Sequence, residues 1–358
     1  MRNGWQLKKL GDFISEYSVK NRCNETIPVY SVTNSQGFCK DYFSKEVASQ
    51  DKRTYKIVPY GCFAYNPSRI NVGSVDWQNK EERVIVSPLY NVFSVSENLN
   101  QDFLLYFLKS NGTMGIINTL ATGTVRLNLK LSMLKEFSII VPPLSDQQSI
   151  VEELNTINEL IRLKKEQLKD YDNLVQSIFY EMFGDPVVNE KGWEVKKFAD
   201  LYKLKSGDSL SAKNFVEGEI PVYGGNGISG YHNDFNMDGD FIIIGRVGVY
   251  CGNVREVHGK FWLTDNAFQL FYSREIQSPC FIHYLLEILD LHKYANAAAQ
   301  PVISNLTLKD VEIIIPPLSL QQLFAKRIEL IEQQKAEIQT TIADLETLLA
   351  SRMQYWFD

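Results

Sequence analysis

The sequence predicts an α+β protein in which two similar globular α/β domains alternate with two long helices that form an antiparallel coiled coil. Three observations support this fold class. A stretch that begins at Val141 recurs without a gap at Ile315, 174 residues later. Each copy carries apolar residues at steps of three and four. The two segments in front of these copies also begin alike. We therefore expect pseudo-two-fold internal symmetry, because an internal repeat decides the architecture of a chain.

Each copy of the repeat predicts one long helix. The first copy opens with VPPLSDQQ and the second with IPPLSLQQ. A Pro-Pro pair stops whatever precedes it, and Ser145 and Ser319 are placed to cap the helices that follow. The apolar spacing is then typical of a coiled coil, with one lysine in each stripe, Lys164 and Lys335. Roughly 35 to 38 helical residues would give a rod of about 50 to 57 Å.

The two helices are expected to pack on each other, since neither apolar stripe would be stable in water alone. An ordinary helical hairpin inside one core is the alternative reading. A whole domain separates the two copies, however, and no gap interrupts their alignment. Both facts favour a rod that carries one domain on each copy.

The two globular domains are diverged copies of each other. Gly4-Trp5 opens the first and Gly192-Trp193 opens the second, and a helical turn should follow each opening. Each domain then contains Ile-Pro-Val-Tyr, at 27–30 and at 220–223. The predicted boundaries are 1–141 for the first domain, 142–184 for the first helix, 185–314 for the second domain and 315–358 for the second helix.

Short runs rich in β-forming residues, broken by Gly, Asn and Pro, fill both domains and predict a strongly bent sheet. A helical segment follows these runs, at 102–109 and at 279–293. A last strand, at 136–141 and at 311–315, then leads into Pro-Pro. We also expect a complete two-domain unit whose ends approach each other, because the second helix ends where a linker to Gly4 would begin.

Composition excludes several classes of protein. A length of 358 residues suggests two or three domains, and 44% hydrophobic with 22% charged residues is typical of a soluble globular chain. Five widely spaced cysteines without a C-x-x-C predict reduced thiols in the cytoplasm and argue against a disulfide framework or a zinc site. The start lacks the apolar core of a signal peptide, and no apolar run approaches the ~20 residues of a membrane helix.

Charge is unevenly distributed along the chain. The net charge is −6, yet residues 1–141 hold 17 Lys+Arg against 12 Asp+Glu, whereas residues 184–314 hold 12 against 17. A protein that grips DNA unaided is expected to show a stronger basic field. Any role on DNA would therefore depend on partner subunits for much of the phosphate contact.

Taken together, the motifs resemble the DNA-specificity subunit of type I restriction-modification systems. The likeness covers the whole chain and rests on the two PPLSxQQ helices, the Gly-Trp openings, MFGDP at 182–186, YNPSRINVGSV at 65–75 and GRVGVYCGNV at 245–254. In that family each globular domain is a target recognition domain that reads one half of a split DNA sequence. The resemblance implies that the paired helices set the spacing of the halves and bind two methyltransferase subunits, with nuclease or translocase subunits as further partners.

The same resemblance implies that this chain is not an enzyme and binds no cofactor. S-adenosylmethionine, magnesium and ATP are expected on partner subunits. Because the two domains differ in sequence, the two DNA words should differ and the site should be asymmetric. The partner-binding residues are expected to be the repeated glutamines and the terminal phenylalanines of the helices: Gln147, Gln148, Gln321, Gln322, Phe183 and Phe357.

Base-reading candidates are polar residues in loops, since Arg, Lys, Asn, Gln, Ser and Thr read base edges. In the first domain they are Thr33, Asn34 and Gln36, then Asn66, Arg69 and Asn71, then Thr124, Arg126 and Asn128. In the second domain they are Tyr223, Asn226, Arg246, Asn266, Gln300 and Asn305. The alternative for each one is a turn residue that satisfies its own backbone. The Gly-rich stretches lack the spacing of phosphate-binding loops and are read as tight turns that let the backbone approach DNA.

No pattern predicts catalysis by this chain. Asn66-Pro67 partly matches an adenine methyltransferase motif, but Ser68 and Arg69 follow it. Asp185 and Glu194 imitate a nuclease site, but Gln6 stands in the matching position of the first domain. Three alternatives stay open: a specificity subunit of a different, type II-like restriction-methylation enzyme, a coiled-coil adaptor that binds proteins only, and a stand-alone methyltransferase.

Overall fold

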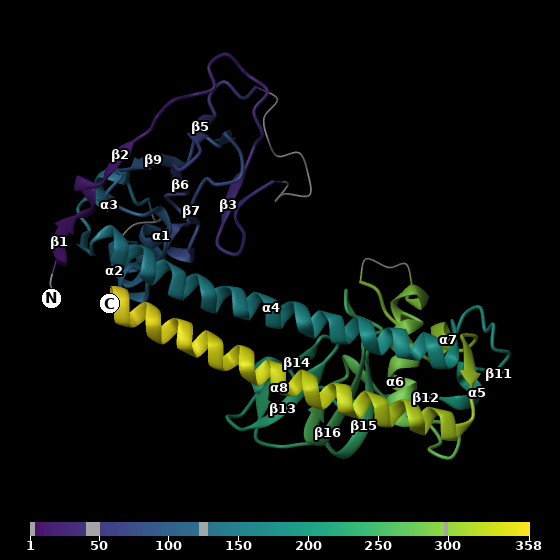
Figure 1. Cartoon of the computed structure of the whole chain (residues 1–358). Helices are drawn as coiled ribbons and strands as arrows, with labels where there is room; N and C mark the ends of the chain where they lie inside the picture. Colours follow the sequence, from purple (N-terminus) through teal and green to yellow (C-terminus); the bar gives the residue numbers. More distant parts are fainter. Residues whose placement is uncertain (1–3, 41–50, 122–127, 297–299) are drawn as a thin grey trace. The chain divides into compact units, whose positions relative to one another are not determined.

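The computed structural model describes residues 4–40, 51–121, 128–296 and 300–358. They form two compact units (Figure 1). Unit 1 comprises Met1–Lys164 with Thr341–Asp358, and unit 2 comprises Lys165–Thr340. Each unit therefore contains one globular domain together with one half of each long helix.

Short strands dominate the globular part of unit 1. A four-stranded sheet has the order β2-β9-β6-β7, and three antiparallel pairs, β1–β10, β3–β4 and β5–β8, surround it. The strands are β1 (Gln6–Lys9), β2 (Ile14–Glu16), β3 (Ser31–Thr33), β4 (Gly37–Cys39), β5 (Lys56–Pro59), β6 (Phe63–Tyr65), β7 (Val75–Trp77), β8 (Arg83–Val86), β9 (Asn91–Val95) and β10 (Ser138–Val141). The helices are η1 (Leu10–Asp12), η2 (Ile70–Val72), α1 (Gln101–Lys109), α2 (Asn111–Ala121) and α3 (Leu131–Lys135).

The core of unit 1 lies between this sheet and α1. Phe63 and Phe93 stack face to face with ring centroids 5.0 Å apart, and the apolar face of α1, including Phe103, is buried against them. Asn100 caps α1, because its side chain accepts a hydrogen bond from the backbone of Phe103. The predicted helix at 102–109 is confirmed with its start one residue earlier.

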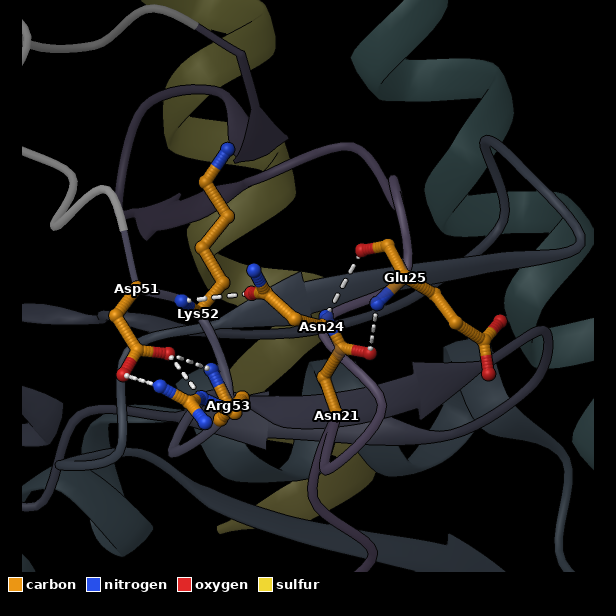
Figure 2. A network of polar contacts seen from close by, with 6 residues as sticks. All are labelled: Asn21, Asn24, Glu25, Asp51, Lys52 and Arg53. Atoms are coloured by element: carbon orange, nitrogen blue, oxygen red, sulfur yellow. Dashed lines mark hydrogen bonds and ion pairs between the residues drawn. The ribbon is translucent and has the colours of Figure 1, made fainter.

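Two loop segments of unit 1, at 21–25 before β3 and at 51–53 before β5, are joined by a side-chain hydrogen bond (Figure 2). Asn21 makes two hydrogen bonds with the backbone of Glu25, each of 2.9 Å. Asn24, which has a left-handed backbone at φ 52°, accepts a bond from the backbone of Lys52. Arg53 binds both carboxylate oxygens of Asp51 at 3.0 Å. Side-chain bonds therefore shape these two segments in place of strand pairing.

Unit 2 contains a larger, six-stranded sheet with the order β12-β17-β15-β16-β13-β14, and a separate pair, β11–β18. The strands are β11 (Glu194–Lys197), β12 (Lys203–Ser206), β13 (Ile220–Gly224), β14 (Gly227–His232), β15 (Met237–Gly245), β16 (Val254–Leu263), β17 (Ala267–Phe271) and β18 (Glu312–Ile315). The helices are α5 (Phe198–Leu201), η3 (Ala212–Asn214), α6 (Pro279–Ile288), η4 (Leu291–Tyr294) and α7 (Asn305–Leu308). The helix expected over 279–293 is interrupted at Asp290, which adopts φ 52°.

The two long helices are α4 (Leu144–Phe183) and α8 (Leu318–Phe357), each of 40 residues. Both begin one residue before the serine that was expected to cap them, so that expectation is wrong. The carbonyl of Pro143 already accepts bonds from Asp146 and Gln147, which places Ser145 inside the first turn. Pro317 has the same role in α8.

The long helices pack together within each unit, as predicted. In unit 1 Arg352 of α8 forms a two-pronged ion pair with Glu153 of α4, and Leu349 and Met353 pack against the core. In unit 2 Lys335 of α8 lies 2.9 Å from Asp172 of α4. Residues early in α4 thus contact residues late in α8, and residues late in α4 contact residues early in α8. The two helices are therefore antiparallel.

The first described residues lie against the end of the chain in unit 1, as expected. Trp5 stacks on Trp356 with ring centroids 6.0 Å apart, and the Asp358 carboxylate accepts a bond from the backbone of Gly112. Among the described residues, no helix is long and apolar enough to cross a membrane.

Candidate nucleic-acid interface

Each unit has a β-hairpin at its Ile-Pro-Val-Tyr motif, directly after the motif in unit 1 and with the motif as its first strand in unit 2, and each hairpin presents polar residues at its tip. In unit 1 the hairpin is β3–β4, and its turn carries Asn34 and Gln36, both exposed. In unit 2 the hairpin is β13–β14, and its turn carries Gly225 and the exposed Asn226. The shared motif thus lies at a hairpin in both units, but the two tips differ in sequence and in their distance from the motif.

A second turn lies beside each hairpin and joins the next antiparallel pair of strands. In unit 1 it is the turn at 66–74 between β6 and β7, and in unit 2 it is the turn at 246–253 between β15 and β16. A Cβ added to Gly73 would lie 2.2 Å from Oδ1 of Asn34, and one added to Gly245 would lie 2.3 Å from the carbonyl oxygen of Gly225. Glycine thus allows the two loops to touch in both units.

A third segment, which contains Leu129 in unit 1 and residues 301–303 in unit 2, lies against the second turn. In unit 1 the backbone of Leu129 donates to the carbonyl of Pro67 at 3.1 Å. In unit 2 the backbone of Gly248 donates to Pro301 at 2.9 Å, and that of Ile303 donates to Arg246 at 3.0 Å. Three segments distant in sequence therefore form one surface, and the same arrangement occurs twice in the chain.

Each surface contains a depression. That of unit 1 has a volume of about 350 Å³, and that of unit 2 about 540 Å³. The first is lined by both predicted loops, through Thr33, Asn34, Asn66 and Arg69. The second includes Asn226, Asn266 and Gln300. Exposed amides and hydroxyls around a shallow hollow can donate to and accept from base edges.

In unit 1 the predicted residues differ in exposure. Asn34, Gln36, Arg69 and Asn128 are exposed, and Asn66 and Asn71 are half-buried. Thr33 is buried, and its hydroxyl accepts a hydrogen bond from the backbone of Gln36 at 3.1 Å, so it shapes the turn. Thr124 and Arg126 lie outside the described residues.

In unit 2 three of the predicted residues have partners inside the unit. Tyr223 packs edge-on against Phe261. Arg246 donates to the hydroxyl of Ser206 at 3.2 Å and lies over the ring of Phe268. Asn305 makes two bonds of 2.9 Å with the backbone of Leu204 and thereby continues the edge of β12.

The predicted partner contacts fall into two groups. Gln148 and Gln322 are exposed, and Phe357 is partly exposed. Gln147, Gln321 and Phe183 have no exposed surface, and both glutamine side chains are hydrogen-bonded inside their own unit. Burial gives these three residues a structural role that the repeat pattern alone did not indicate.

Sequence reasoning missed several residues of the two surfaces. Ser74, Val72 and Tyr90 line the depression of unit 1, and Phe215 and Ser229 line that of unit 2. A single sequence carries no periodic signal for such residues, because segments far apart in the chain bring them together. Among the described residues, no group of three or more His, Cys, Asp or Glu side chains could hold a metal ion.

Comparison with known proteins assigns the family. A model of the type I restriction modification DNA specificity domain matches residues 2–170 and matches again at 190–347. The chain belongs to this family. Each of the two matches contains one globular domain, which agrees with the internal repeat.

Curated relatives are similar over parts of their length. The type I restriction enzyme EcoprrI specificity subunit of Escherichia coli is 30% identical over 151 residues, which cover 40% of this chain and 37% of that subunit. A putative type I specificity subunit of Mycoplasma pneumoniae is 29% identical over 199 residues, which cover 53% of this chain and 81% of that protein. The shared segment thus spans little more than a third of the E. coli subunit.

Solved structures share the fold. The S subunit of a type I restriction-modification system from M. genitalium superposes with a TM-score of 0.59 at 17% identity, covering 100% of this chain and 97% of that one. A chain from a structural study of complex assembly in the type I R-M system superposes with a TM-score of 0.62 at 17% identity, covering 100% and 98%. Both support the predicted arrangement of two α/β domains and two long helices.

Proposed function

We propose that this chain is the non-catalytic, cytoplasmic DNA-recognition subunit of a type I restriction-modification complex. Each unit reads one word of an asymmetric, bipartite target. The long helices set the gap between the words and bind two methyltransferase subunits, which methylate adenines. S-adenosylmethionine, magnesium and ATP bind to the partner subunits. Nuclease subunits, where they are present, add restriction of unmethylated DNA.

One observation carries the proposal: the same three-segment surface occurs in both units with different side chains. A hairpin tip, a strand-joining turn and a third segment meet in each unit, but Asn34 and Gln36 stand at one tip and Gly225 and Asn226 at the other. Equivalent geometry suits two equivalent partners, whereas different side chains suit two different DNA words.

The small net charge of the chain agrees with a division of DNA binding between this chain and its partner subunits. Phosphate contacts supply most of the affinity for DNA but carry no sequence information. A net charge of −6 fits a subunit that contributes base readout while partner subunits neutralise phosphates. Isolated chain is therefore expected to bind DNA weakly, and the assembled complex tightly.

Methylome sequencing tests the proposal directly. The chain is expressed with the methyltransferase gene adjacent to it, and the control cells express that methyltransferase alone. A bipartite motif with methylated adenines should appear only with the chain present. If the subunits are made and co-purify but no motif appears, the recognition role is refuted.

The surface assignment has its own test in the same assay. Asn34→Ala with Gln36→Ala should relax the first word and leave the second unchanged, and Asn226→Ala with Asn266→Ala should do the reverse. Lys203→Ala, an exposed change on β12 outside both surfaces, should alter neither word. Relaxation of both words by either pair would contradict the assignment of one word to each unit.

A further inference from the structure

The β3–β4 hairpin of unit 1, which carries Asn34 and Gln36 at its tip, is not part of a larger sheet. Strands β3 and β4 pair only with each other among the described residues. Isolated two-stranded hairpins are at best marginally stable in water. Other contacts must therefore fix the position of the tip that carries Asn34 and Gln36.

The apolar side chains of Val32 and Phe38 are buried in a small core with Tyr30, and polar side chains near β7 add hydrogen bonds to both strands. The hydroxyl of Ser74 donates to the carbonyl of Val32 on β3 at 2.6 Å. The backbone of Phe38 on β4 donates to Oδ2 of Asp76 at 2.9 Å. Val32 and Phe38 face each other across the hairpin, so both strands are held at the same level. Ser74 is 5% exposed, which leaves little water to replace its bond.

The local backbone is adapted to this docking. Gly37 precedes Phe38 with φ 59°, and a Cβ there would lie 1.8 Å from Oδ2 of Asp76. Tyr90 adds a bond, because its hydroxyl accepts from the backbone of Val32 at 3.4 Å. Burial raises the pKa of Asp76, since desolvation disfavours its charged form, and a neutral acceptor in its place would carry a smaller desolvation cost.

The hairpin of unit 2 is held differently. Strand β13 pairs in parallel with β16 at Val222 and Tyr223, and so belongs to the six-stranded sheet. Thr264 also binds the carbonyl of Tyr223, through its hydroxyl at 3.0 Å and through its own backbone at 2.9 Å. Backbone pairing therefore fixes the hairpin of unit 2, whereas side-chain bonds from Ser74 and Asp76 hold the hairpin of unit 1.

We propose that Ser74 and Asp76 are positioning residues for the first DNA word, acting through the β3–β4 hairpin. The inference rests on the proposed function. Neither residue is required to touch a base, because each acts on the backbone of a strand that carries the reading tip. Loss of either bond should let the tip move and should lower discrimination between bases in one word only.

The test measures, for the complex with its methyltransferase, the relative methylation of targets with single substitutions in each word. Ser74→Ala and Asp76→Ala should each lower discrimination in the first word by about tenfold, the scale of one lost base contact. The second word of the same targets is the internal control and should not change. Asp76→Asn keeps an acceptor for Phe38 and should restore discrimination.

Thr264→Val is the matched control in unit 2. It removes a buried hydroxyl that binds a hairpin carbonyl and accepts a longer bond of 3.4 Å from the backbone of Asn266, but the backbone bond to Tyr223 and the strand pairing remain. We expect it to change discrimination in the second word by less than about threefold. An equally large loss there would contradict the role of strand pairing in the argument.

Failure of the inference is distinguishable from failure of the proposed function. If wild-type complex methylates no bipartite target, the proposed function fails. If wild type does so but both Ser74→Ala and Asp76→Ala keep full discrimination, or blur both words equally, the positioning role is overturned. Should one variant not assemble, the other decides the question.

Discussion

Gln147 and Gln321, 174 residues apart, make the same three hydrogen bonds in the two units. The side-chain oxygen accepts from the backbone of a helix-capping residue, Asn100 at 2.8 Å and Ser278 at 2.9 Å. The side-chain nitrogen donates to the carbonyl of the residue two positions before the capping residue, Asn98 or Ile276. It also donates to the carbonyl of the first proline of the Pro-Pro pair. One glutamine thus joins the start of a long helix to the start of a domain helix.

Removal of this amide should loosen one unit only. Gln321→Ala leaves several backbone groups around Ser278 buried without partners, at a cost of about 1–3 kcal/mol each before relaxation. We expect faster hydrogen exchange in α6, measured by mass spectrometry, and no change in α1. The neighbouring Gln322→Ala is an exposed control and should cost less than about 0.5 kcal/mol. Equal effects of the two changes would contradict the structural role.

The aromatic cluster at the end of α4 should make Phe183 more sensitive than its repeat equivalent. Phe183 is fully buried, with ring centroids 5.0 Å from Phe179, 4.8 Å from Phe281 and 5.3 Å from Phe324. Phe183→Ala is expected to destabilise unit 2 by about 3–5 kcal/mol. Phe357 is partly exposed, so Phe357→Ala should destabilise unit 1 by roughly half as much. Hydrogen exchange in each unit, measured at increasing urea concentration, gives both losses of stability. A larger loss for Phe357→Ala than for Phe183→Ala would refute the comparison.

The Arg352–Glu153 pair should make the stability of unit 1 depend on pH. Hydrogen bonds from Arg352 lower the pKa of Glu153 below its ordinary 4.5. A depressed carboxyl pKa stabilises the fold at pH values above the unfolded pKa, and this contribution is lost as pH falls through the folded pKa. Glu153→Gln should therefore lower Tm at pH 7, and the difference from wild type should shrink below pH 4.5. About a third of each side chain is exposed, so 0.5 M salt should also reduce the difference.

Two glycines of one turn in unit 2 should respond differently to alanine. Gly248 and Gly252 have similar backbones, with φ 86° and 90°. A Cβ on Gly248 meets nothing within 4 Å, whereas one on Gly252 would lie 2.5 Å from the backbone nitrogen of His292. Gly248→Ala should cost only the left-handed strain of about 1–2 kcal/mol. Gly252→Ala must also displace η4 and should cost clearly more in thermal unfolding. Equal losses would show that the turn can move.

The long helices were predictable from sequence because their signals are local and repeated. Apolar spacing and the Pro-Pro pairs predicted helices over 142–184 and 315–358, and the structure has them at 144–183 and 318–357. The caps were mistaken, because a serine after Pro-Pro looks like a cap although the proline carbonyl already accepts the first helical bonds.

The reading surface was only partly predictable. Polar turns such as Thr33–Gln36 and Asn66–Asn71 stand out in the sequence, and the structure brings these two together around one depression. Asn305 and Arg246 look the same in the sequence but bind within their own unit. A polar side chain in a loop does not reveal whether its partner is its own backbone or a ligand, since that depends on segments distant in the chain.

The packing of Trp356 and Phe357 on the core of unit 1 has a consequence for synthesis on the ribosome. Unit 2 is built from the continuous stretch Lys165–Thr340 and can finish folding once that stretch has emerged. Unit 1 begins first, yet its core includes contacts from Leu349, Met353, Trp356 and Phe357. The domain made first is therefore completed last, and a prematurely terminated chain would present a finished second domain beside an open first one.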